Sequence, residues 1–127
     1  MRSIATGIDL VEIERFQTLD PKIRERFYKR VFTPSELTAA SGLLQNLAGK
    51  FAAKEATAKA LGCGIGEIKW QDIEILNDEN GKPTLVLHDK ALDNAQNAFW
   101  SDCSISISHT TAYAVAIVTA IIETPDR

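Results

Sequence analysis

Two acidic side chains stand where the sequence pattern leads us to expect apolar ones. Glu55 lies at the centre of the apolar stripe of a helix predicted over residues 45–61, drawn on a wheel of about 100° per residue. Asp9 lies in a strand predicted over Ser3–Ile13, and its neighbours on both faces are small or apolar. Because burying an unpaired ion costs several kcal/mol or more, each carboxylate is expected to meet a cation.

A divalent ion shared by the two carboxylates would satisfy both. Mg²⁺ is typically held by one or two carboxylates, water molecules and the phosphate oxygens of a substrate. Two local explanations stay open at this point. Lys59 lies one helical turn after Glu55 and could form an i,i+4 ion pair worth about 0.2–0.5 kcal/mol, and Asp9 could cap the end of its strand. For Glu55, its position on the helix favours neither a shared metal ion nor the local ion pair over the other. For Asp9, spacing alone favours the local explanation.

Cations gather in the segment 22–30. It carries five cations and one anion, a charge of +4, so the remaining residues sum to −7 in a chain of net charge −3. On the helix predicted over 21–31, Arg24 lies apart from four cations that share one face: Lys22, Arg26, Lys29 and Arg30. Such a run is usually a solvated face. On an acidic protein it also fits an acidic partner better than general nucleic-acid affinity.

Other motifs point away from several classes of function. The glycine-rich segment 62–66 follows a helix instead of joining a strand to a helix N-terminus, so it predicts a helix cap and not a dinucleotide loop. Cys63 and Cys103 lack metal-ligand spacing and are expected to be reduced. The longest apolar stretch, 112–122, is shorter than the roughly 20 residues of a membrane span. The N-terminus does not match a secretory signal, and we expect a cytoplasmic location.

The elements that must position these residues are short and mixed in type. Helices are predicted over 21–31, from the capping box Thr33–Glu36, over 45–61 with Gly62 as cap, and over 89–99; strands are predicted over 3–13, 72–76, 84–88, 103–108 and 112–122. Apolar residues on both faces of 3–13 predict an interior strand. Two hairpins, turning at 77–83 and 109–111, favour an α+β fold with mainly antiparallel sheet packed with the long helix, and residues 1–127 are expected to form one domain.

Four segments, in order, resemble the holo-acyl-carrier-protein synthase group of the 4′-phosphopantetheinyl transferase family. Gly7–Phe16 and Phe51–Gly62 are similar to the paired signature of that group, and Asn77–Pro83 and Ser106–Thr110 are similar to its two later landmarks. The likeness covers nearly the whole chain. Two departures are mild: Cys63 stands where threonine is usual, and Lys50 where arginine is usual.

The resemblance implies an activity and an assembly. Members of the family transfer the phosphopantetheine arm of coenzyme A to a serine of acyl carrier protein and release adenosine 3′,5′-bisphosphate. They depend on Mg²⁺ and work as homotrimers with sites between neighbouring subunits. No nucleic acid or membrane partner is implied.

The resemblance also assigns roles to residues. Asp9 and Glu55 match the metal-binding acids, and Lys59 matches the lysine near the pyrophosphate, so these three are the expected catalytic residues. The coenzyme is expected to contact a further set: Lys50, Lys59, Gly62, Gly64, His109 and Thr110. Arg15 joins the cationic helix face as a docking contact for the acidic carrier. We expect Glu55 to be the base for the acceptor serine, acting directly or through a metal-bound water, and Asp9 is the alternative that the sequence does not distinguish from it.

Two other classes of function remain to be tested. A Mg²⁺-dependent hydrolase would cleave the same pyrophosphate with water as acceptor and would need no docking face. A non-catalytic binding module would use the basic helix to hold an acidic protein or a nucleic acid, and it would need no acids in apolar surroundings.

Overall fold

The computed structural model describes residues 1–126, in which runs of helices stand between single strands and hairpins. In order they are β1 (Arg2–Glu12), α1 (Glu14–Gln17), α2 (Pro21–Val31), α3 (Pro34–Ala40), α4 (Leu44–Leu61), the 3₁₀ turn η1 (Trp70–Asp72), β2 (Ile73–Asn77), β3 (Pro83–Leu87), α5 (Asp89–Asn97), β4 (Trp100–His109) and β5 (Tyr113–Glu123). The predicted helices and strands are all present, most of them within two residues of the expected bounds.

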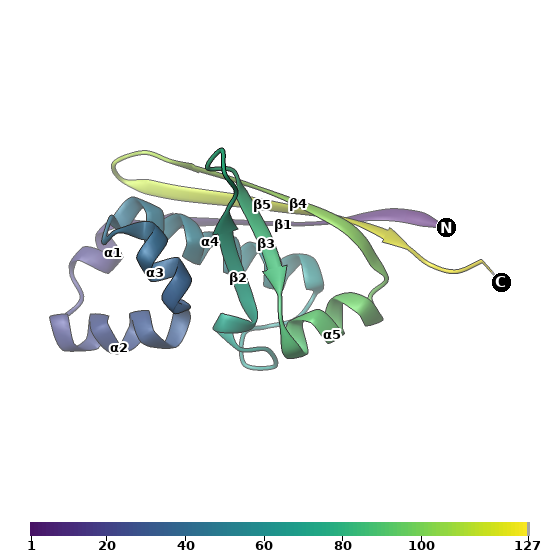
Figure 1. Ribbon diagram of the computed structural model, residues 1–127, viewed down its shortest axis with the longest axis horizontal. Coiled ribbons are helices and arrows are strands. Elements are labelled where there is room, and N and C mark those ends of the chain that lie inside the picture. The colour runs from purple at the N-terminus through teal and green to yellow at the C-terminus, as the bar shows by residue number, and fades with distance from the viewer. Residues whose placement is uncertain (127) are drawn as a thin grey trace.

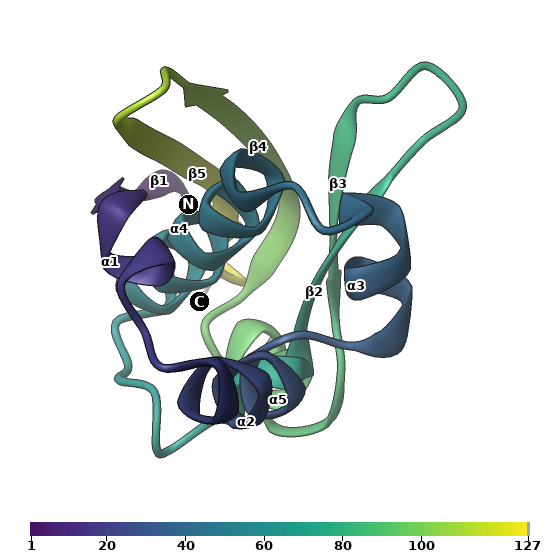
Figure 2. The same ribbon diagram turned by 90° about the vertical axis from the view of Figure 1, so that its left-hand side faces the viewer.

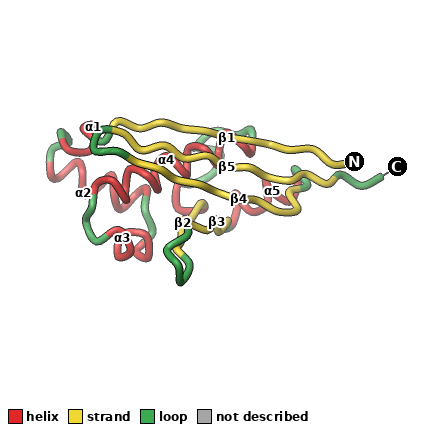
Figure 3. The backbone as a smooth tube through the Cα atoms, turned by 90° about the horizontal axis from the view of Figure 1, so that it is seen from above, coloured by secondary structure: helices red, strands yellow, loops and turns green. Residues whose placement is uncertain are grey.

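Two antiparallel sheets form the β layer of the fold. The larger sheet has the order β1-β5-β4, and its three long strands run side by side along the molecule (Figure 3). The smaller sheet is the β2–β3 hairpin, which lies beside β4 with its strands at a steep angle to those of the larger sheet (Figure 1). The predicted α+β class with antiparallel sheet is confirmed.

The long helix α4 packs against one face of the larger sheet with small side chains. Ala48, Ala52 and Ala56 are fully buried along this helix. A Cβ atom at Gly7 would lie 1.9 Å from the Ala56 carbonyl oxygen, and one at Gly49 would lie 2.8 Å from Ile107 Cγ2. Helix and sheet therefore approach more closely than larger side chains would allow.

Local sequence signals set the ends of the helices. The Asp20 side chain accepts a hydrogen bond from the Lys22 amide at the start of α2. Thr33 and Glu36 form the reciprocal capping box at the start of α3. Gly62 ends α4 in the left-handed conformation with φ of 74°. These three ends were predicted, and the structure confirms them.

The prediction that β1 is an interior strand is wrong for this chain. Among the strands of residues 1–126, β1 pairs with β5 alone and lies at an edge of the sheet. Its outward side chains are exposed, with Ile8 at 58% and Leu10 at 62% of their accessible surface. Apolar residues on both faces of a strand indicate that both faces are covered, but they do not say whether the cover belongs to the same chain.

Smaller differences have local causes. The helix expected over 89–99 ends at Asn97, because Phe99 takes a positive φ of 62° and starts the turn into β4. The one-turn helix α1 and the turn η1 are too short to carry a periodic signal. No helix within residues 1–126 is both long and apolar enough to cross a membrane.

Candidate active site at the edge of the sheet

Asp9 lies in the middle of β1 and faces α4. Its Cα atom pairs with that of Ala116 on β5, so Asp9 does not cap a strand end. It shares the inward face with Gly7, whose missing side chain lets α4 approach at this point. The Asp9 side chain is only 19% exposed. The strand therefore presents a largely covered carboxylate to the helix.

Lys59 reaches from α4 to β1. Its Nζ atom donates hydrogen bonds to the Ile8 carbonyl oxygen at 2.9 Å and to Asp9 Oδ1 at 3.2 Å, and its side chain is 55% exposed. The ion pair between Glu55 and Lys59, which was the local explanation for Glu55, does not form in this structure. Within residues 1–126, the carboxylate that Lys59 contacts is Asp9, which lies 50 positions earlier in the sequence.

Glu55 is half-buried one helical turn before Lys59. Burial raises the pKa of its carboxyl group above the ordinary value, the negative charge of Asp9 raises it further, and Lys59 acts in the opposite sense. The Glu55 carboxylate makes no hydrogen bond or ion pair with any other residue of the described chain. Two carboxylates from distant parts of the sequence thus lie close enough to repel each other, with one lysine beside them.

This arrangement suits a divalent cation that also binds a substrate. Residues 1–126 contain no group of three or more histidine, cysteine or acidic side chains that could hold a metal by themselves. A site with only Asp9 and Glu55 as protein ligands would leave the remaining positions to water and to phosphate oxygens, as is usual for Mg²⁺. The donor set therefore fits Mg²⁺ better than a metal that needs a closed protein cage.

The residues expected to contact the coenzyme fall into two groups. Lys50 and His109 line a hollow of about 220 Å³ between α4, β4 and the β2–β3 loop, together with Asn46, Gly49, Ile107 and others. The ammonium of Lys50 donates to the Ile75 carbonyl oxygen at 3.1 Å, and burial lowers the pKa of this lysine. Lys59 and Gly62 lie on the far part of the helix, and Gly64 follows them. Lys50 and Lys59 are nine residues apart, which places them on opposite sides of α4 at about 100° per residue.

Thr110 has a structural task in this chain. Its Oγ1 atom accepts hydrogen bonds from the amides of Ala112 at 3.2 Å and Tyr113 at 3.0 Å, so it holds the turn between β4 and β5. His109, the last residue of β4, is exposed and borders the hollow. Of this adjacent pair, His109 is the side chain that lies at the hollow.

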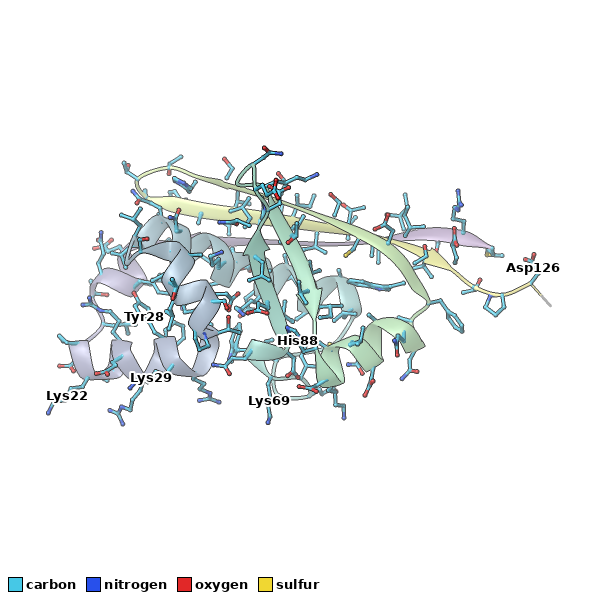
Figure 4. All side chains as sticks on the ribbon, in the orientation of Figure 1. Lys22, Tyr28, Lys29, Lys69, His88 and Asp126 are labelled. Carbon is cyan, nitrogen blue, oxygen red and sulfur yellow. The ribbon has the colours of Figure 1, made fainter. Side chains whose placement is uncertain are left out.

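The cationic face of α2 is present as expected. Lys22, Arg26, Lys29 and Arg30 are all exposed, and Figure 4 shows Lys22 and Lys29 extending away from the body of the molecule. The guanidinium of Arg24 turns inward and donates to the Leu19 carbonyl oxygen at 3.2 Å. Lys29 is the one member of the face with an ion pair inside the described chain, to Glu25 at 3.2 Å.

An apolar hollow next to this face was not predicted. It has a volume of about 210 Å³, and its lining is mostly apolar: Val11, Phe16, Leu19, Ile23, Phe27 and Phe51, with Arg15 as its charged member. Val11 follows Asp9 on the inward face of β1, and Phe51 precedes Glu55 by one helical turn. The hollow therefore lies between the cationic helix and the parts of β1 and α4 that carry the two acids. Its lining comes from four elements, so no single periodic pattern in the sequence reveals it.

Comparison with known proteins agrees with this architecture. Residues 5–118 match the model of the 4′-phosphopantetheinyl transferase superfamily. The holo-[acyl-carrier-protein] synthase of Geobacter sulfurreducens is 45% identical over 124 residues, covering 94% of this chain and 97% of that protein. The corresponding synthase of Alkaliphilus metalliredigens is 46% identical over 113 residues, covering 87% of this chain and 92% of that protein.

The fold of the chain also matches that of a solved structure from the same family. The crystal structure of the Helicobacter pylori holo-[acyl-carrier-protein] synthase in complex with coenzyme A superposes with a TM-score of 0.82 at 33% identity, covering 91% of this chain and 98% of that chain. Fold, length and sequence agree over nearly all of both proteins. The chain belongs to the 4′-phosphopantetheinyl transferase superfamily.

Proposed function

We propose that this enzyme moves the 4′-phosphopantetheine group of coenzyme A to a serine of apo acyl carrier protein, with a Mg²⁺ ion held by Asp9 and Glu55. The transfer itself follows from the family and from relatives of the same length, which are named holo-[acyl-carrier-protein] synthases. The observation that carries the site is the convergence of Asp9 and Glu55, from β1 and α4, beside Lys59.

The reaction forms one bond and breaks another at the same phosphorus. The serine oxygen bonds to the phosphorus that carries pantetheine, and the bond from that phosphorus to adenosine 3′,5′-bisphosphate breaks. A divalent ion bound by Asp9 and Glu55 would neutralise negative charge on the pyrophosphate. The protein's own task is then to place the two substrates and to handle one proton.

Lys59 is suited to bind the pyrophosphate. Two of the three donors on its ammonium are directed to the Ile8 carbonyl and to Asp9, which fixes the position of Nζ. The side chain stays about half exposed, so a further donor remains for a phosphate oxygen of the substrate. A lysine held in this way stabilises charge as it develops on the leaving group.

Glu55 is the better candidate for the base. Asp9 already accepts a hydrogen bond from Lys59, whereas the Glu55 carboxylate has no partner within residues 1–126. An unpaired carboxylate next to the metal and the pyrophosphate can accept the proton of the serine hydroxyl, directly or through a water molecule.

The first test is the mass of the carrier protein. Incubation of this enzyme with Mg²⁺, coenzyme A and apo carrier is expected to raise the mass of the carrier by one phosphopantetheine group, and chelation of the metal is expected to stop the change. Free phosphopantetheine as the main product, with an unmodified carrier, would show a hydrolase instead of a transferase.

The carrier is proposed to dock on α2. The exposed face of Lys22, Arg26, Lys29 and Arg30 fits an acidic partner, and Arg15 extends it towards Asp9. The apolar hollow between them offers a place for an apolar side chain of the carrier. Docking here would bring the carrier surface next to the two acids.

A homotrimer would complete the site and cover the sheet. The acids lie at the β1 edge, and the hollow with Lys50 and His109 lies at the β4 edge, with β5 between them. One coenzyme held by both groups would therefore lie between the acids of one copy and the hollow of its neighbour. The outward face of the sheet is apolar and exposed at several positions, as a contact between copies requires: Ile4, Ile8, Leu10, Ile117 and Ile121.

Ile8→Asp is expected to separate the subunits. Ile8 is 58% exposed in the single chain, yet in an assembly the new charge would be buried against a neighbour. Light scattering should give the mass of one chain for this variant and of three for the parent, and transfer activity should fall with the loss of trimer. Leu92→Asp is the control, since Leu92 lies on α5 and is 41% exposed away from the sheet. A trimeric and fully active Ile8→Asp variant would place the contact elsewhere.

A further inference from the structure

A fully buried ion pair lies between α3 and α4 and includes neither of the two acids of the site. Lys54 Nζ is 2.8 Å from Glu36 Oε1, and both side chains have no exposed surface. The proposed function uses neither residue. Glu36 belongs to α3 and Lys54 to α4, and Figure 2 shows α3 and the β2–β3 hairpin standing together beside α4.

The pair is hydrogen-bonded to four further residues in three segments of the chain. Besides Glu36, the Lys54 ammonium donates to the Trp70 carbonyl at 3.1 Å and to the Ile73 carbonyl. Glu36 Oε1 also accepts from the Thr33 amide at 2.8 Å, and Oε2 accepts from the Ile75 amide at 2.9 Å. Three donors and two acceptor atoms thus link α4 to the start of α3, to η1 and to β2.

This linkage lies between the two functional surfaces. Lys54 directly precedes Glu55, so the two side chains leave α4 about 100° apart. On the other side, Phe32 is buried at the end of α2, the docking helix, and its ring centroid is 5.9 Å from Lys54 Nζ. A rotation of α4 that moved Glu55 would break the contacts of Lys54.

Other contacts of α4 also resist such a rotation, since Lys50 donates to the Ile75 carbonyl and Lys59 donates to the Ile8 carbonyl and to Asp9. The face against the sheet is built of alanines, which interlock less than large side chains do. A buried ion pair is weak evidence for stability, because apolar residues of similar volume often serve as well. Its directional contacts do define one orientation of the groups that make them.

We propose that Lys54 and Glu36 are positioning residues, which hold Glu55 and Lys59 in register with Asp9 and tie that register to the docking helix. The proposal rests on the function proposed above. Neither residue touches substrate. They act through α4, so their removal should lower turnover and metal affinity even where the chain is folded.

The test is the double variant Lys54→Met with Glu36→Gln. It removes both charges together, keeps similar volumes and leaves an acceptor for the Ile75 amide. At a temperature well below its unfolding transition, kcat is expected to fall about 10- to 100-fold, the cost of a displacement on the order of 1 Å. KM for coenzyme A should change far less. Affinity for Mn²⁺, followed by the electron paramagnetic resonance signal of the free ion, should weaken.

Thr57→Val is the matched control on the same helix. Thr57 is also fully buried, but its hydroxyl donates only to the Ala53 carbonyl within α4, at 2.7 Å. This variant should keep the parental kcat and Mn²⁺ affinity. A purely structural role of the ion pair would lower the melting temperature of the double variant and leave both quantities unchanged, and that result would overturn the proposal.

A second variant keeps the test decisive if the double variant does not fold. Lys54→Arg retains the charge opposite Glu36, but a planar guanidinium does not direct its donors to the same three acceptors. It should fold and show the same loss of kcat, whereas parental turnover would count against positioning. Glu55→Gln is assayed in parallel: if it also turns over normally, the proposed catalytic site fails, and if it is inactive while the Lys54 variants are normal, only the positioning role fails.

Discussion

Replacing Glu55 by glutamine is expected to lower kcat for carrier modification about 10³-fold or more. Glutamine is close in size, so the half-buried position on α4 stays filled, but it removes the charge that a divalent ion needs and the base that accepts the serine proton. General base catalysis alone typically contributes about 10²- to 10⁴-fold. The measurement is the rate at which the carrier gains mass at saturating coenzyme A and carrier.

Binding of the carrier should survive this change. The docking face is on α2 and the substituted residue is on α4, so the dissociation constant of apo carrier, measured by calorimetry, should stay within about twofold of the parent. Glu67→Gln, a neutralisation of the same kind in an exposed turn, is the matched control and should leave turnover unaffected. Unchanged turnover in Glu55→Gln would leave only a binding module or a different catalytic centre.

Local rules were enough to predict most of the fold from the sequence. The start of α3 needs only the pattern from Thr33 to Glu36, and the end of α4 needs only Gly62 after a run of helix formers. The β2–β3 turn is similar: the Asp78 side chain accepts from the amides of Asn80 and Lys82, and Gly81 takes a φ of 81°. Signals of this kind act over a few residues, which is why they survive without knowledge of the tertiary structure.

The acids of the site were found by a pattern that was only partly right. Asp9 and Glu55 do converge, but Glu55 lies at the border of the buried surface and not at its centre. The helical wheel assumes one buried stripe, whereas α4 is covered on most of its circumference by the sheet, α3 and β2. For such a helix a wheel cannot rank positions by burial.

The buried ion pair of Lys54 and Glu36 was not predicted either. Lys54 was not singled out, because a lysine in a helix is usually solvated, yet its side chain is fully buried. Glu36 was recognised as part of a capping box, which is a surface motif in most helices. Its second partner, the Lys54 ammonium, is 18 positions away and meets it only because α3 folds back onto α4.

The apolar residues on the outer face of β1 led to the wrong prediction of an interior strand. Ile4, Ile8 and Leu10 make this face apolar, which indicates a covering surface, and nothing within residues 1–126 covers it. A sequence specifies the need for burial but not the identity of the covering surface. The proposed contact between copies reconciles the apolar pattern with the edge position of the strand.

Reversing two charges on α2 tests the proposed docking surface and is expected to have a large effect on KM for the carrier. In the double variant Arg26→Glu with Arg30→Glu, KM for the carrier is expected to rise about 30-fold or more, since like charges set against an acidic partner are unfavourable by several kcal/mol and each 1.4 kcal/mol is tenfold. KM for coenzyme A should stay near the parental value, because the coenzyme contacts proposed above lie on other elements. Steady-state kinetics with each substrate varied in turn give both constants.

The dependence of KM on salt and a matched charge reversal on another helix test the same docking surface. Parental KM for the carrier should rise with ionic strength, because exposed charges are screened beyond a Debye length of about 10 Å at 0.1 M salt, and the double variant should lose most of that dependence. Lys90→Glu, compared with Arg26→Glu alone, makes the same change in net charge on the exposed surface of α5. It should leave KM for the carrier within about twofold of the parent, because docking depends on where the cations are and not on total charge. Equal effects of the two single reversals, or equal effects on both substrates, would remove α2 as the docking helix and leave its cations as an ordinary solvated face.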